Sequence, residues 1–153
     1  MLDFFSILLS LINIININPV DEDSVLCMTQ NIYFEARSES EKGRAAVAFV
    51  TMNRVESSKF PNTICNVVWD RKQFSWTHDG KSDWPAKNKI EMKAWKECKQ
   101  MAYTFLYFWP TLKYMDHTNK STHYHADHIS PFWNVAYNES ARIGGHIFYN
   151  EGP

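Results

Sequence analysis

The sequence predicts an α+β domain that is predominantly helical, with a small β element toward its C-terminal end. Apolar residues recur at helical spacing in three segments between positions 24 and 110. This periodicity stops near Lys113, and short β-prone pieces separated by turn residues follow it. The length of 153 residues fits one domain, and no internal repeat or low-complexity tract divides the chain.

The first helix is expected to start at Ser24, whose hydroxyl group suits an N-cap. The helix would run through Leu26, Gln30 and Tyr33, with its apolar residues on a buried face. It would carry Glu35 at its C-terminal end.

The second helix is expected after a polar turn, where Ser38 and Glu41 have the spacing of a capping box. The apolar series from Ala45 to Val55 follows, so this helix should form the centre of the domain. The segment 60–63 (FPNT) predicts a turn. We expect short irregular or extended structure over 65–76.

The third and longest helix is expected to open at Trp84-Pro85 and to stop at Pro110, because proline suits the first turn of a helix but not its interior. After it, the segments 122–124 (THY) and 146–149 (HIFY) predict short strands. They complete the expected α+β architecture.

Residues 1–20 form an apolar leader, and positions 4–20 contain no charged residue. The leader predicts an export signal, a signal-anchor or a helix with transient membrane association, although Asp3 stands where a signal peptide carries cations. The alternative is a terminal helix that packs on the domain. The working domain is expected to comprise residues 21–153.

The composition excludes several classes of protein. Hydrophobic residues make up 44% and charged residues 22%, which argues against intrinsic disorder. The formal charge of −1 argues against a dedicated nucleic-acid binder. Aromatic residues reach 15%, so some should line a binding cleft. Of the three cysteines, Cys27 and Cys98 lie on predicted apolar helix faces, where either a buried disulfide or two packed thiols would fit.

Glu35 is the leading candidate for chemistry. It lies among apolar residues at a predicted helix end, and such surroundings raise the pKa of a carboxyl group, as a general acid needs near neutral pH. The alternative is a surface ion pair with Arg37 or Arg44.

Several motifs occur together in one order: NIYFEARSES (31–40), GRAAVA (43–48), NRV (53–55), FPNTIC (60–65), QFSW (73–76), THYH (122–125) and GGHIFY (144–149). With these motifs, the chain resembles the cell-wall hydrolase family typified by the spore cortex-lytic enzyme SleB. The resemblance covers positions 26–150. The resemblance implies a lysozyme-like fold related to goose-type lysozymes and lytic transglycosylases. It implies cleavage of peptidoglycan glycan strands between N-acetylmuramic acid and N-acetylglucosamine, with Glu35 as the catalytic residue and no metal or organic cofactor.

The substrate-binding residues are expected around the same motifs: Arg37, Glu39, Gln73, Phe74, Ser75, Trp76, Thr122, His123 and Tyr124. For Phe74 and Trp76, plain core packing is an equal alternative. A hydrolase needs a second carboxylate, for which Glu39, Glu41, Asp79 and Asp127 are candidates. A lytic transglycosylase needs only Glu35, which acts first as acid and then as base while the sugar closes an anhydro ring.

Two other functions stay open. A zinc-dependent amidase could use His123, His125 and His128 with Asp127, although these residues lack a recognised zinc-binding pattern. A non-catalytic glycan-binding module is the other alternative. We expect a monomer that acts on the bacterial wall, either as a phage endolysin made in the host cytoplasm or as a bacterial wall hydrolase.

Overall fold

The computed structural model describes residues 20–152, so the predictions for the leader, residues 1–20, lie outside it except at Val20. The α-helices are α2 (Glu22–Ala36), α3 (Glu41–Glu56), α4 (Ile64–Val68) and α5 (Lys89–Leu112). Short 3-10 helices are η1 (Ser75–His78), η2 (Lys113–Met115) and η3 (Phe132–Ala136), and the strands are β1 (His123–Ala126), β2 (Asn138–Ile143) and β3 (His146–Asn150). The predicted α+β class, mostly helical with a small sheet, is confirmed. Within residues 20–152, every helix is too short or too polar to cross a membrane.

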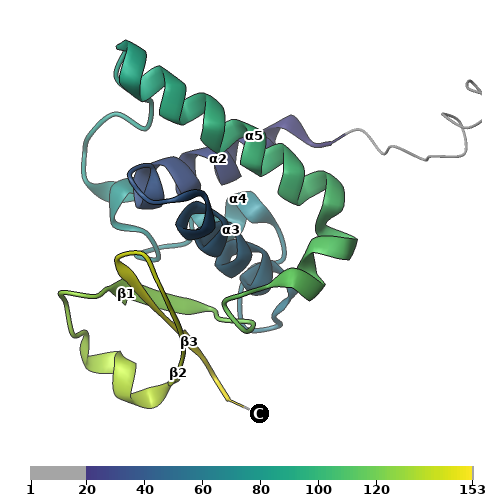
Figure 1. Ribbon diagram of the computed structural model, residues 1–153, viewed down its shortest axis with the longest axis vertical. Helices are drawn as coiled ribbons and strands as arrows, with labels where there is room; N and C mark the ends of the chain where they lie inside the picture. The colour runs from purple at the N-terminus through teal and green to yellow at the C-terminus, as the bar shows by residue number, and fades with distance from the viewer. Residues whose placement is uncertain (1–19, 153) are drawn as a thin grey trace, which may run out of the picture.

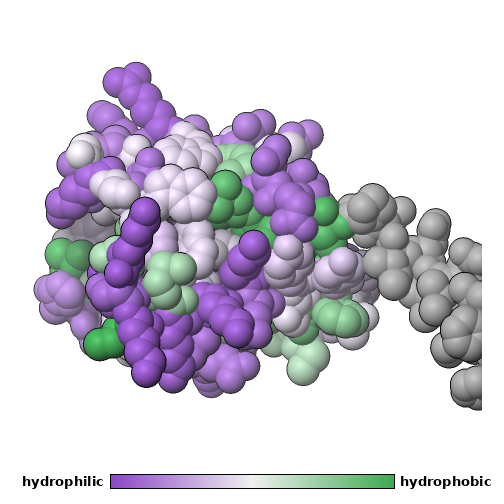
Figure 2. All heavy atoms as spheres, turned by 90° about the horizontal axis from the view of Figure 1, so that it is seen from above, coloured by the Kyte–Doolittle hydropathy of each residue, from purple (hydrophilic) through white to green (hydrophobic). Residues whose placement is uncertain are grey.

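The helices form one layer of the domain, and α2 runs through its core. Met28 and Ile32 on α2 are completely buried. Helix α5 passes over α2, as Figure 1 shows, and contributes the buried residues Cys98 and Phe105. Seen from the side of α5, the surface is mainly hydrophilic (Figure 2). The helices therefore pack apolar faces inward, while α5 also keeps Ile90, Tyr107 and Phe108 exposed.

The sheet forms the second layer, with strand order β1-β3-β2 and antiparallel pairing throughout. Helix α3 joins the two layers because it is apolar on two sides. Ala46 and Val50 pack against Ile143 and Phe148 of the sheet. Phe49, on another side of α3, packs into the helical core. Figure 1 shows the sheet below the helices, with α3 between the sheet and α5.

The predicted caps of the first two helices are each displaced. Asp21 caps α2 and accepts a hydrogen bond from the Ser24 amide at 3.1 Å, so Ser24 lies inside the first turn. Ser40, not Ser38, caps α3 and accepts from the Gly43 amide at 3.2 Å. In both cases a nearby side chain of equal capping ability lies closer to where the backbone turns into the helix.

Both ends of the long helix also differ from the prediction. Asn88 caps α5, because its Oδ1 accepts from the amides of Ile90 and Glu91. The helix does not stop at Pro110 but continues to Leu112. Trp109 and Leu112 pack against the helical core on either side of the proline, and this packing outweighs the backbone hydrogen bond that the proline cannot make.

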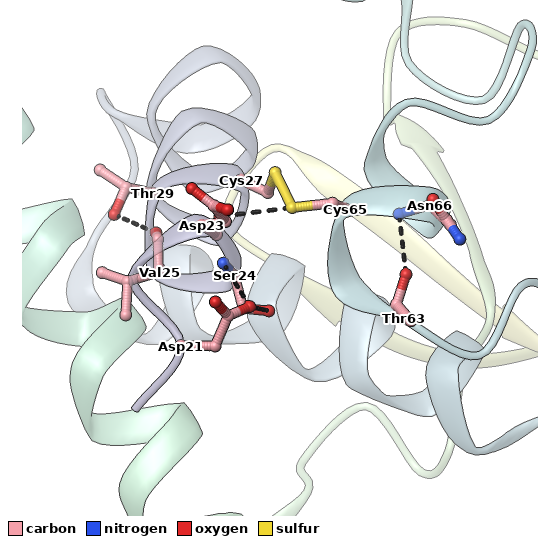
Figure 3. Close-up of a disulfide and its surroundings, with 9 residues drawn as sticks. All are labelled: Asp21, Asp23, Ser24, Val25, Cys27, Thr29, Thr63, Cys65 and Asn66. Carbon is pink, nitrogen blue, oxygen red and sulfur yellow. Dashed lines mark hydrogen bonds between the residues drawn. A yellow bond between two sulfur atoms is a disulfide. The ribbon is translucent and has the colours of Figure 1, made fainter. Parts of the chain in front are cut away.

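The cysteines pair differently from the expectation. Cys27 on α2 forms a disulfide with Cys65 on α4 (Figure 3). Cys98 is a buried free thiol. Cys65 lies on a helix because Thr63 caps α4 by accepting from the Asn66 amide at 3.2 Å. The expectation of short irregular or extended structure over 65–76 is therefore wrong for the residues of α4. Strand β2 was not predicted either, because its sequence, NESARI, is mostly polar.

Candidate active site

A cleft of about 490 Å³ lies where the end of α2, the segment before η1 and the face of the sheet meet. Glu35 and Arg54 reach it from α2 and α3, and Tyr124 and His146 from β1 and β3. The remaining lining residues come from η1, η3, β1 and the loops beside them: Lys72, Gln73, Phe74, Ser75, His78, His123, His125, Ala126, Ile129, Pro131 and Trp133.

Glu35 lies in the last turn of α2, directly before the chain leaves the helix at Arg37. The hydroxyl group of Tyr124 donates a hydrogen bond to Oε2 of Glu35 at 2.8 Å. This contact fixes one carboxyl oxygen on the sheet side. The ion pair with Arg37 or Arg44 that sequence spacing also allowed is not formed, because Arg37 pairs with Glu91 and Arg44 with Glu97.

Burial raises the pKa of the Glu35 carboxyl, and this effect exceeds the opposing effects of the Tyr124 hydrogen bond and of the charge on Arg54. The pKa of Tyr124 is raised well above its ordinary value by burial and by the neighbouring Glu35 carboxylate. Tyr124 therefore stays a phenol that donates its proton. The direction of the Glu35 shift is the one that a general acid needs.

Arg54 is the charged group buried beneath the cleft, with 4% of its surface exposed. Its Nε donates to the backbone carbonyl of Thr122 at 2.7 Å. The guanidinium lies 5.2 Å from the ring centroids of both Phe60 and Phe74. Arg54 thus anchors the start of β1, the strand that carries Tyr124, and places a positive charge near Glu35.

The structure places Gln73, Phe74, Ser75, His123 and Tyr124 among the lining residues of the cleft. Phe74 is only 3% exposed, so it packs in the core and also forms part of the cleft wall. His123 stacks on the ring of Tyr137 with centroids 4.1 Å apart. Gln73 and Ser75 are exposed, so their polar groups are free to meet a ligand.

Four other residues expected to bind substrate lie outside the lining of this cleft. Trp76 is buried beneath it, where its ring stacks on Phe34 and its indole N–H donates to Asn31. Arg37 pairs with Glu91 in the first turn of α5. The carbonyl of Thr122 is held by Arg54. Glu39 lies behind the cleft, against the turn between β2 and β3.

The histidine cluster does not assemble as a zinc site would require. His123 and His125 share one face of β1, since both contact Trp133, but each is engaged with protein groups. Nε2 of His125 lies 2.9 Å from the hydroxyl group of Tyr149. His128 is exposed and faces Asp127 at 3.6 Å. Across residues 20–152, no three His, Cys, Asp or Glu residues form a group that could hold a metal ion.

Sequence reasoning missed the roles of Arg54, His146 and Trp133 in this site. Arg54 carried a usable signal, because it is a charged residue in the apolar series of a core helix. His146 and Trp133 reach the cleft through strand pairing and the β1–β2 connection. Neither contact can be deduced from local sequence.

A lysozyme-like α+β domain with one buried acid in an aromatic-lined cleft is typical of enzymes that act on glycans. The comparison with known families agrees. The model of the Cell Wall Hydrolase family matches residues 38–149, and this chain belongs to that family. The match begins directly after the Glu35 segment, so the role of Glu35 depends on the geometry described above.

The chain is similar to spore cortex-lytic enzymes. It is 36% identical to that of Bacillus cereus over 63 residues, which is 41% of this chain and 24% of the relative. It is 26% identical to that of Bacillus subtilis over 127 residues, which is 82% of this chain and 37% of the relative. The chain therefore spans well under half the length of these curated relatives.

Two solved structures match nearly the whole described domain. The catalytic domain of the Bacillus cereus SleB protein has a TM-score of 0.63 at 27% identity, covering 87% of this chain and 94% of that one. The catalytic domain of the germination-specific lytic transglycosylase SleB from Bacillus anthracis has a TM-score of 0.65 at 27% identity, covering 87% and 98%. The predicted lysozyme-like fold agrees with these matches.

Proposed function

We propose that this domain cleaves the glycan strands of peptidoglycan between N-acetylmuramic acid and N-acetylglucosamine, with Glu35 as the proton donor. The observation that carries the proposal is the partly buried Glu35 carboxyl, held by Tyr124 at 2.8 Å in a cleft with aromatic walls. Membership of the cell wall hydrolase family supports the choice of substrate. The similarity to a lytic transglycosylase supports the choice of the glycan bond over the peptide bond.

In the first step, protonated Glu35 gives its proton to the glycosidic oxygen. The bond between that oxygen and C1 of muramic acid breaks, and positive charge develops on the sugar ring. The new Glu35 carboxylate is stabilised by the hydrogen bond from Tyr124 and by the charge of Arg54. Burial raises the pKa of Glu35 and so favours the protonated acid before the step, and these two groups stabilise the anion after it.

In the second step, either the C6 hydroxyl group of the same muramic acid or a water molecule attacks C1 and loses a proton. We favour the intramolecular attack, which closes a 1,6-anhydro ring, because the cleft lining contains a single carboxylate. An inverting or retaining hydrolase would need a second one close by.

The polar residues on the cleft wall are proposed to bind the sugars. Gln73 and Ser75 are exposed there and offer amide and hydroxyl groups for the N-acetyl and hydroxyl groups of a saccharide. His123, which is partly exposed, offers a ring surface for a sugar face, and the buried Phe74 supports the wall of the cleft behind it. Trp76, Arg37 and Thr122 would act indirectly, by holding the structure on which the cleft depends.

Action on peptidoglycan places the working enzyme at the bacterial wall. The disulfide between Cys27 and Cys65 supports a non-reducing compartment such as the periplasm or the cell exterior. We propose that the domain works as a monomer, either as a phage endolysin or as a bacterial wall hydrolase. Location of the gene within a prophage lysis region would support the endolysin role, and a chromosomal position among wall-metabolism genes would contradict it.

The test is mass spectrometry of fragments released from purified peptidoglycan. Wild type should release fragments with anhydromuramic ends, and Glu35→Gln should release none. If the fragments instead carry reducing muramic ends, and their release also depends on Glu35, the enzyme is a muramidase and not a lytic transglycosylase. The proposal fails if wild type binds the wall without releasing fragments, since that is the behaviour of a glycan-binding module.

A parallel digestion with a chelator tests the zinc amidase. We expect the same anhydromuramic fragments at the same rate. Free stem peptides that disappear with the chelator and persist in Glu35→Gln would instead assign the chemistry to His123, His125 and His128.

A further inference from the structure

His146 is a second titratable group in the cleft that the mechanism above does not use. It is the first residue of β3 and belongs to the lining of the cleft that holds Glu35. Its ring lies edge-on to the ring of Tyr124, with centroids 5.4 Å apart. The same Tyr124 donates its hydroxyl proton to Glu35. Tyr124 therefore contacts both Glu35 and His146.

Glu39 lies behind His146. Its Oε1 is 3.7 Å from Nδ1 of His146, and the two side chains are only 21% and 13% exposed. Nδ1 of His146 is buried and has no hydrogen-bond partner among residues 20–152. The nearby carboxylate favours the tautomer with the proton on Nδ1, which leaves the lone pair on Nε2.

Two glycines make room for the Glu39 side chain. A Cβ on Gly144 would lie 2.0 Å from Oε2 of Glu39, and a Cβ on Gly43 would lie 2.8 Å from its Cβ. The amide of Gly145 donates to Oε1 of Glu39 at 3.3 Å. Gly144 also has a φ of +56°, which strongly favours glycine. The turn between β2 and β3 is thus built around this carboxylate.

We propose that His146 is a second acid–base residue of the site, and that Glu39 is the positioning residue that orients it. The inference rests on the proposed function, since it assigns the proton transfer of the second step. In other histidine bases a carboxylate hydrogen-bonded to Nδ1 fixes the tautomer and the direction of the ring. Glu39 approaches Nδ1 of His146 to 3.7 Å and is the carboxylate placed to take this part.

The proton balance of the second step then uses two groups. The oxygen of the C6 hydroxyl group forms its bond to C1 while its proton passes to Nε2 of His146. Glu35 is a carboxylate at this point, having given its proton to the departing oxygen. The imidazolium returns its proton to Glu35, directly or through water, and both groups regain their starting states. If water is the nucleophile, its oxygen forms the bond to C1 and its proton passes to Nε2 of His146.

The surroundings of His146 allow this role. Burial lowers its pKa, so the ring is neutral at neutral pH and can accept a proton. Glu39 and Asp127 oppose this effect and raise the pKa, whereas His125 and His128 lower it further. Tyr124 packs on the ring as a neutral phenol.

The experiment measures kcat against pH on purified peptidoglycan for wild type, His146→Asn, Glu39→Gln and the double variant. We expect His146→Asn to lower kcat about 100-fold and Glu39→Gln about tenfold. In Glu39→Gln the low-pH limb should move to lower pH, because the carboxylate that raises the His146 pKa is gone. In the His146→Asn background, Glu39→Gln should have no further effect on kcat.

Rescue by imidazole separates chemistry from folding. His146→Ala should regain activity when free imidazole is added, whereas a variant that only misfolds would not. His117→Asn serves as the matched control, since His117 packs against Phe49 outside the cleft and should keep wild-type kcat. Melting temperatures of all variants identify any that fail to fold.

The outcomes distinguish this inference from the proposed function. If wild type releases glycan fragments and Glu35→Gln does not, the proposed function holds. Folded His146→Asn with wild-type kcat and an unchanged pH profile would then overturn the role of His146 alone. An effect of Glu39→Gln that persists in the His146→Asn background would overturn the positioning role of Glu39. If wild type releases no fragments, the proposed function itself has failed.

Discussion

The hydroxyl group of Tyr124 donates a hydrogen bond to Oε2 of Glu35 at 2.8 Å, across 89 positions of the chain. This bond joins the helical layer to the sheet at the point where the acid is needed. It favours the carboxylate form of Glu35 and so opposes the rise in pKa caused by burial. The first prediction follows from that opposition.

Tyr124→Phe should raise the pKa of Glu35 further, because burial remains while the hydrogen bond is lost. The high-pH limb of the activity profile should therefore move to higher pH. The maximal rate should fall about tenfold, since the Glu35 carboxylate loses a stabilising donor. Rates measured across the pH range check both effects. A high-pH limb that moves to lower pH would contradict this account of Glu35.

Arg54→Gln should destabilise the domain by about 3 kcal/mol, because the Thr122 carbonyl loses its charged donor and the guanidinium no longer packs on Phe60 and Phe74. Urea unfolding measures the change in the free energy of unfolding. Arg142→Gln is the control, since Arg142 forms an exposed pair with Glu139 and its loss should have no measurable effect. Equal stability of the two variants would contradict the anchoring role of Arg54.

His123 should make the domain less stable in mild acid. Burial lowers its pKa to about 4, so the folded domain resists protonation while the unfolded chain binds a proton near its ordinary pKa. Its contribution to stability is present above about pH 6.5 and is lost as the pH falls toward about 4. The melting temperature of wild type should fall more between about pH 7 and about pH 5 than that of His123→Gln. An identical fall in both proteins would show that His123 is not the group responsible.

The disulfide should contribute about 3 to 4 kcal/mol to stability, because it closes a loop with a sequence separation of 38. Reductant should lower the free energy of unfolding of wild type by this amount. The Cys27→Ala/Cys65→Ala variant should be equally destabilised and insensitive to reductant. A double variant that still responds to reductant would contradict the Cys27–Cys65 pairing.

The sequence predicted best what depends on local pattern. The apolar spacing located the helices, and the apolar surroundings of Glu35 indicated an acid with a raised pKa, which the structure confirms. Helix ends were predicted less well. Asp21 and Ser40 replaced Ser24 and Ser38 as caps because several neighbouring side chains can accept the same amide hydrogens.

Features that depend on tertiary packing could not be predicted. The contact of Tyr124 with Glu35 and the approach of His146 to Glu39 arise from the register of the sheet against the helices. The pairing of Cys27 with Cys65 arises from α4, a helix of five residues that is too short to show periodicity. Pro110 was interpreted as a stop because local rules do not include the packing of Trp109 and Leu112.

The central claim is that Glu35 donates the proton that breaks the glycan strand. The most direct measurement compares the rate of fragment release by wild type, Glu35→Gln and Glu41→Gln on the same purified peptidoglycan. Glu41 is an exposed carboxylate in the first turn of α3 and is the matched control. We expect Glu35→Gln to lose activity by about 1,000-fold or more while Glu41→Gln stays at the wild-type rate. A folded Glu35→Gln that retains more than about a tenth of the wild-type rate would contradict the claim.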